Sequence, residues 1–133
     1  MNAPHERRTR QRIVTVQAGQ PRFWLVWGGQ RLELQDLSLE GFAVSASTPP
    51  GSDQPFEFVI EHEGDTSIVS GRAQVVNYLA RAGAGLAGCR FVELFGEGEA
   101  ALSRWLAGHV IACSALPLRE EDAARIVAGP SII

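Results

Sequence analysis

The sequence has no lysine, so all 12 of its basic side chains are arginines. Cysteine is also scarce: Cys89 and Cys113 are the only two, and neither belongs to a Cys-x-x-Cys pair or lies near clustered histidines. That spacing excludes a zinc ring and argues against a disulfide scaffold, so we expect both thiols to be reduced.

Long apolar runs are missing as well. Arg, Glu or Gly interrupts each run well before the roughly 18 residues that a membrane-spanning helix needs. Residues 1–12 are too highly charged for a signal peptide. We therefore expect a cytoplasmic protein that does not insert into a membrane.

The net charge of −3 is unevenly distributed along the 133 residues, a length that fits one domain. Residues 1–35 hold six Arg and two Glu, a charge of +4, and residues 36–133 hold six Arg and thirteen acids, a charge of −7. A basic segment followed by an acidic body argues against general DNA or RNA binding, which needs a broad positive surface, and leaves room for a small anion. Arginine suits such a ligand, because its planar guanidinium can stack on a base and form paired hydrogen bonds.

The first two thirds of the chain predict short β-strands separated by turns. Leu32 and Leu34 alternate with polar residues, and Phe56, Phe58 and Ile60 alternate in the same way. Gly-Gly, Pro-Pro-Gly and Glu-Gly-Asp sequences separate the segments, as in antiparallel hairpins. The expected strands are 13–16, 23–27, 31–37, 42–45, 55–61, 67–78 and 85–94. Because an open sheet would leave unpaired edges, we expect an all-β meander closed into a small barrel.

The apolar period changes after Leu94 to that of an amphipathic helix. Its expected apolar stripe is Leu102, Trp105, Leu106, His109, Val110 and Cys113.

We expect this helix to end at Pro117 and to cap the barrel, covering the outer face of segment 23–27, where apolar side chains point both ways. A second short helix is expected to begin with the acids 120–122, which favour the positive end of the helix dipole, and to stop at 129–130. The resulting division is a flexible Arg-rich tail (1–12), a barrel (13–96) and a helical segment (97–133).

Two motifs in the sequence indicate ligand chemistry. Arg8 and Arg12 lie four residues apart in the basic run, a spacing that chance alone produces roughly once in such a chain. The sequence Asp-Leu-Ser-Leu-Glu-Gly at 36–41 has the form Asp/Asn-x-Ser-x-x-Gly, for which chance predicts only about 0.04 occurrences per chain. By itself this hexapeptide is also compatible with a turn in which Asp36 or Ser38 bonds nearby backbone and Gly41 adopts a positive φ angle.

Together these motifs make the chain similar to the PilZ family of bacterial cyclic di-GMP receptors. The resemblance rests on Arg-Thr-Arg-Gln-Arg at 8–12 and on the hexapeptide at 36–41. Gly-Arg-Ala at 71–73 and Gly-Cys-Arg-Phe-Val-Glu-Leu at 88–94 are further features of that family. The resemblance covers about residues 6–106 and implies a six-stranded antiparallel β-barrel followed by a helix.

The resemblance also implies a ligand, cyclic di-GMP, and a second-messenger signalling role without metal or catalysis. Arg8 and Arg12 would engage a guanine edge in a fork and stack on its face. Asp36 would accept the guanine N1 and N2 hydrogens, and Ser38 would donate to a phosphate or ring atom. The remaining residues implied for the ligand site are Gly41, through close backbone approach, and Arg7 and Arg10, as auxiliary phosphate contacts. The strand after residue 72 has no Trp to close over a base, and Tyr78 is the aromatic residue that could take its place.

Such a receptor would order its Arg-rich tail on binding the nucleotide and signal to a partner protein, in motility, pilus or exopolysaccharide control. A homodimer built on Trp24 and Trp27 stays open as a possibility.

Three other functions compete with this one. An enzyme is disfavoured, because His5, His62 and His109 have no triad-like spacing and a solvated strand end explains Glu61 and Glu63. A PilZ-type interaction module that has lost nucleotide affinity is the main alternative. RNA binding through residues 7–12 would show a steep salt dependence, and the acidic body of the chain argues against it.

Overall fold

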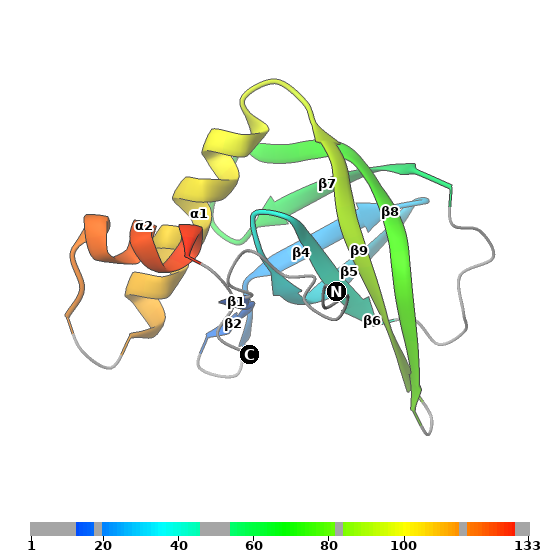
Figure 1. The fold of residues 1–133 in the computed structure, drawn as a ribbon, viewed down its shortest axis with the longest axis horizontal. Helices are drawn as coiled ribbons and strands as arrows, with labels where there is room; N and C mark the ends of the chain where they lie inside the picture. The colour runs from blue at the N-terminus through cyan, green and yellow to red at the C-terminus, as the bar shows by residue number, and fades with distance from the viewer. Residues whose placement is uncertain (1–12, 18–19, 46–53, 82–83, 115–116, 130–133) are drawn as a thin grey trace, which may run out of the picture.

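The computed structural model describes residues 13–17, 20–45, 54–81, 84–114 and 117–129 (Figure 1). Its elements in these ranges are β1 (Ile13–Val14), β2 (Val16–Gln17), β3 (Gln20–Pro21), β4 (Phe23–Trp27), β5 (Gln30–Leu37), β6 (Gly41–Ser45), β7 (Phe56–His62), β8 (Ile68–Arg81), β9 (Ala84–Leu94), α1 (Gly98–Cys113) and α2 (Glu120–Ala128).

Strands β4 to β9 form a closed antiparallel barrel. They pair in the order β5-β4-β7-β8-β9-β6, and β6 returns to pair with β5. The first hairpin turns at Gly28 and Gly29, whose φ angles of 61° and 81° match the tight turn that follows the twist of the strands. The predicted six-stranded antiparallel barrel followed by a helix is confirmed.

The strand expected at 13–16 is interrupted at Thr15. This side chain is fully buried, and its hydroxyl donates a hydrogen bond to the carbonyl of Leu34. The backbone beyond it leaves the main sheet, so β2 pairs with β3 in a separate two-stranded ladder. β1 remains in the main sheet and pairs with the end of β5, in continuation of β4.

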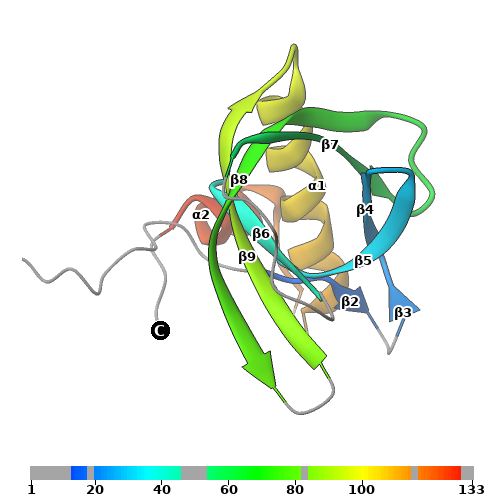
Figure 2. The same ribbon diagram turned by 90° about the vertical axis from the view of Figure 1, so that its right-hand side faces the viewer.

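Helix α1 closes one end of the barrel, and Figure 2 shows it behind the ring of strands. Its predicted apolar stripe is confirmed at Leu102, Trp105, Leu106 and His109, which are buried, whereas Cys113 is exposed. The ring of Trp105 lies 6.2 Å from the ring of Phe23 between centroids. The helix ends at Cys113, before the expected stop at Pro117.

The face of β4 that the helix covers differs from the expected one. Phe23, which contacts α1, points into the barrel together with Leu25. Trp24 points outward, and the Arg31 guanidinium lies 4.0 Å above its ring. Arg31 in turn forms an ion pair with Glu61 at 2.9 Å. The Arg31–Glu61 ion pair therefore lies over Trp24 on the outer face of β4, whereas helix α1 packs against the open end of the barrel.

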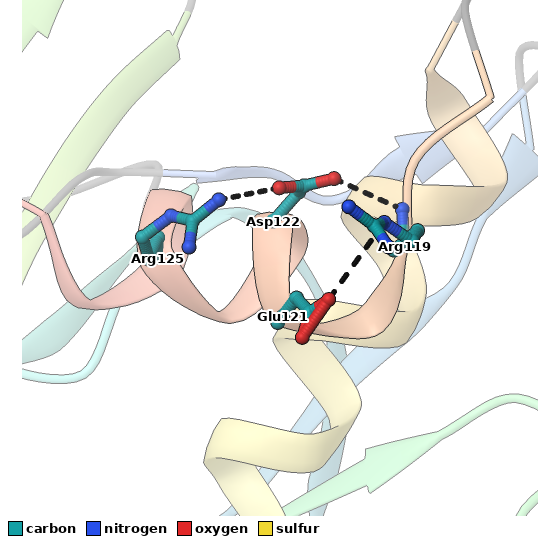
Figure 3. Close-up of polar contacts among 4 residues, drawn as sticks. All are labelled: Arg119, Glu121, Asp122 and Arg125. Carbon is teal, nitrogen blue, oxygen red and sulfur yellow. Dashed lines mark hydrogen bonds and ion pairs between the residues drawn. The ribbon is translucent and has the colours of Figure 1, made fainter.

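Helix α2 packs on α1 through Ala123 and Val127, which are buried. It begins at Glu120, as the acidic run predicted. Figure 3 shows the Asp122 carboxylate accepting a hydrogen bond from the Arg119 backbone N–H and pairing with Arg125. Neither described helix is long and apolar enough to cross a membrane.

Candidate functional site

The motif at 36–41 spans the end of β5, a turn and the start of β6. The strand register puts one residue from each of five strands in a row across the sheet, in the order Val14, Asp36, Ala43, Gly88 and Asn77. Directly opposite residues on paired strands share a face, and Val14 is 65% exposed, so this row faces outward. The neighbouring row faces the core and consists of Ile13, Leu37, Phe42 and Cys89.

A second outward row lies two residues further along the strands. Gly41 of β6 is opposite Arg90 of β9, and Arg90 is opposite Gln74 of β8. Three neighbouring members of these two rows are small: Gly41, Ala43 and Gly88. We call these three residues the small-residue strip.

Ser38 holds the turn between β5 and β6. Its Oγ accepts hydrogen bonds from the backbone N–H groups of Glu40 at 3.0 Å and Gly41 at 3.2 Å. The Ser38 N–H donates to the Gly41 carbonyl at 2.9 Å, and the side chain is only 2% exposed. The local turn with which the hexapeptide is compatible is therefore present, and the Ser38 side chain stabilises it.

Gly41 is required by close packing and not by a special φ angle. Among the described glycines, positive φ angles occur at Gly28, Gly29, Gly64 and Gly96, so the positive φ that the alternative turn would give Gly41 is not present. A Cβ at Gly41 would collide with the backbone carbonyl of Cys89 on the neighbouring strand. The Phe91 N–H also donates to the Glu40 carbonyl at 2.8 Å, so β9 fits tightly against the turn.

Asp36 is half-buried at the edge of the small-residue strip. The four arginines of the basic run, Arg7, Arg8, Arg10 and Arg12, lie outside the described residues. The structure describes the chain immediately after them. Ile13 lies opposite Leu37, and Val14 lies opposite Asp36. The chain thus enters the barrel beside the hexapeptide.

The neighbours of the motif were not among the site residues expected from the sequence. Ala43 and Gly88 form the small-residue strip with Gly41, and Arg90, Gln74 and Asn77 border it on β9 and β8. The Asn77 side chain lies so close to Gly88 that a Cβ there would collide with its amide. The run at 88–94 is a family feature of the sequence, but no local signal places these residues beside the motif, because their proximity depends on how distant strands pair. Tyr78 faces inward and packs against the core.

The cysteine beneath the strip is inert. Cys89 is 3% exposed, and burial raises the pKa of its thiol to about 12. A thiol with this pKa stays protonated at neutral pH and is a poor nucleophile.

The described histidines gather at the helix-capped end of the barrel. The His62 ring stacks on Phe23 at 4.5 Å between centroids, and His109 lies edge-on to the same ring at 5.2 Å. The His109 Nε2 lies 2.8 Å from the carbonyl oxygen of Val14. Burial lowers the pKa of both imidazoles, and the nearby charge of Arg22 adds to this effect. His109 is therefore the satisfied core histidine that its place on the apolar stripe predicted.

One neighbouring acid belongs to this end of the barrel. The Trp105 Nε1 donates a hydrogen bond of 3.0 Å to Asp65. Hydrogen bonds from Ser67 lower the pKa of Asp65. Within the described ranges, no group of three or more His, Cys, Asp or Glu side chains could hold a metal ion.

Comparison with known proteins identifies a family. A family model described as PilZ domain matches residues 4–108, which include the basic run, the whole barrel and the first part of α1. No curated protein matches the chain.

Proposed function

This chain belongs to the PilZ domain family, and we propose on that premise that it is a receptor for cyclic di-GMP. PilZ domains are generally cyclic di-GMP-binding modules and are not enzymes. In this proposal the nucleotide binds between the Arg-rich tail and the motif at 36–41.

The pairing of β1 with β5 carries the proposal. Val14 lies opposite Asp36, and Arg12 precedes Val14 by two positions in the sequence. Since consecutive Cα atoms are 3.8 Å apart, the Arg12 Cα is within about 7 Å of the Val14 Cα in any conformation. Arg8 is six positions before Val14, a distance of at most about 20 Å when extended. Both arginines can therefore act on a ligand held at Asp36.

The chemistry of these residues suits a guanine nucleotide. A guanidinium can form two hydrogen bonds to guanine O6 and N7, and a second one can stack on the base. Asp36 supplies a carboxylate acceptor for the guanine N1 and N2 hydrogens. At roughly 1–3 kcal/mol for each good contact, Arg8, Arg12 and Asp36 together support micromolar or tighter binding.

The other expected site residues have supporting roles. We assign Ser38 to shaping the turn, because its oxygen already accepts two backbone hydrogen bonds. Gly41 keeps this part of the strip free of a side chain. Arg7 and Arg10 are proposed as auxiliary phosphate contacts.

Ligand binding would order the tail, and the entropy lost on ordering would offset part of the contact energy. The tail continues into β1, whose Val14 carbonyl is held by His109 of α1. We propose that this contact transmits the ordering of the tail to the helices. The helices would then contact a partner protein or a second copy of the chain.

Isothermal titration of cyclic di-GMP into wild type and Asp36→Asn tests this site. We expect saturable binding by the wild type and at least tenfold weaker binding by the variant. Glu33→Gln is the matched control, because it removes the same charge from an exposed position on the same strand. Equal binding by the wild type and Asp36→Asn would refute the role of Asp36, and a wild type without affinity would favour an interaction module.

A further inference from the structure

We propose that Arg90 of β9 is an additional ligand-binding residue of this chain and contacts a phosphate of the cyclic dinucleotide. This inference rests on the proposed function. It adds a cation to the proposed site, on the opposite side of the small-residue strip from Asp36.

The position of Arg90 follows from the strand register. Arg90 lies directly opposite Gly41, the last residue of the hexapeptide, and the two share the outward face. Gly41 has no side chain, so no side chain of this directly opposite residue separates Arg90 from the strip. On its other side Arg90 is opposite Gln74, a neutral residue.

Arg90 also differs from the other outward strand arginines whose side chains the structure describes. Arg31 forms an ion pair with Glu61 at 2.9 Å, and Arg72 forms one with Glu93 at 2.8 Å. Each of those pairs joins neighbouring strands. Arg90 is exposed and forms no ion pair with a described residue, because both of its cross-strand neighbours are uncharged.

The distance between Arg90 and Asp36 suits one ligand that carries hydrogen-bond donors at one end and a negative charge at the other. Arg90 and Asp36 are two strand spacings apart across the sheet and two residues apart along it, which corresponds to about 12 Å between their Cα atoms. A ligand that reaches both must present hydrogen-bond donors to the carboxylate and an anion to the guanidinium. A guanine nucleotide has both features, since its base edge carries the donors and its phosphates carry the negative charge.

The small-residue strip puts no large side chain of its own between Asp36 and Arg90. Gly41 has no side chain, Ala43 adds a single methyl group that is 2% exposed, and the Asn77 amide lies against Gly88. A larger side chain at these positions would separate the ligand from Arg90. The strip and the exposed Arg90 side chain therefore support the same binding mode.

The experiment is an isothermal titration of cyclic di-GMP into wild type, Arg90→Ala, Arg90→Lys and Arg72→Ala. Arg72→Ala is the matched control, because it removes an equal charge from an exposed position on the same barrel. We expect Arg90→Ala to raise the Kd about tenfold, the usual cost of one lost charge-assisted hydrogen bond. Arg90→Lys should stay within about threefold of the wild type, because a phosphate accepts a simple ammonium charge.

The outcomes separate this inference from the proposed function. If the wild type binds and Asp36→Asn weakens binding, but Arg90→Ala binds like Arg72→Ala, then Arg90 is not a ligand residue and the receptor function stands. If Arg90→Lys loses as much affinity as Arg90→Ala, the contact is not a phosphate contact, and this assignment is overturned. If the wild type does not bind, both proposals fail. Thermal unfolding of each variant checks that the barrel is intact.

Discussion

The imidazole of His109 lies 2.8 Å from the backbone carbonyl of Val14 and so joins helix α1 to the strand that follows the Arg-rich tail. Val14 in turn pairs with Asp36 on β5. The proposed ligand site and the C-terminal helices are thus connected through one short strand, and His109 is the side chain at which that connection can be broken.

His109→Ala should weaken both folding and this connection. The side chain is 4% exposed and packs against Phe23, so we expect the free energy of unfolding to fall by about 2–3 kcal/mol. Urea denaturation measures this loss. His109→Gln, which keeps a hydrogen-bond donor, should recover part of it. A loss below about 0.5 kcal/mol for His109→Ala would show that the contact contributes little.

The stability of the protein should fall as the pH drops below about 6.5, the usual pKa of histidine. Burial lowers the pKa of His62 and of His109 in the folded state, so the unfolded chain binds protons more readily in this range. Stability is therefore fully present above the unfolded pKa and is lost as the pH falls toward the folded values.

The charged neighbours of His62 modify this dependence. Asp65 and Glu63 raise its pKa, and Arg22 and His109 lower it, but desolvation is the largest effect. Thermal unfolding between pH 7.5 and pH 5 should show a decline in Tm that is smaller in His62→Leu, a variant that removes one of the two imidazoles. A His62→Leu profile parallel to the wild type would contradict the role assigned to His62.

Gly41→Ala should strongly destabilise the barrel. The added Cβ would collide with the Cys89 carbonyl, so β6 and β9 would have to separate, at a cost we expect to exceed about 3 kcal/mol. Gly108→Ala is the matched control, because no atom lies within 4 Å of a Cβ at this exposed position of α1. That control should gain up to about 1 kcal/mol from its higher helix propensity. Equal melting temperatures for the two variants would disprove the close approach.

Ser38→Ala should lower stability by about 1–3 kcal/mol, because the backbone N–H groups of Glu40 and Gly41 would lose their acceptor. Its nucleotide affinity should fall along with the order of the turn. Ser38→Thr retains the hydroxyl and tests whether the oxygen is the source of the stability. A Ser38→Ala variant with unchanged stability and lower affinity would instead show that the hydroxyl contacts the ligand.

The sequence predicted most of the barrel because burial on one face of a strand produces a local pattern. The alternation of Phe56, Phe58 and Ile60 marks β7, and the change of period after Leu94 marks α1. The interruption at Thr15 was not predictable, since it depends on a hydrogen bond to the distant Leu34.

The candidate site was predictable only in part. The motif at 36–41 is contiguous and could be identified directly, but its neighbours Arg90, Gln74 and Asn77 depend on the β8–β9 register. That register shifts between Arg72 and Ala73 and again between Val75 and Asn77. Each irregularity of this kind changes which side chains share a face, and alternation alone does not locate it.

The central claim is that the Arg-rich tail and the motif at 36–41 bind the nucleotide together. Isothermal titration of cyclic di-GMP into the wild type and into the double variant Arg8→Ala/Arg12→Ala tests it most directly. Arg119→Ala/Arg125→Ala, which removes two exposed arginines from the region of α2, is the control. We expect micromolar or tighter binding by the wild type and the control and a loss of at least a hundredfold in the double tail variant. Absence of binding by the wild type, or equal binding by the wild type and the double tail variant, would contradict the claim.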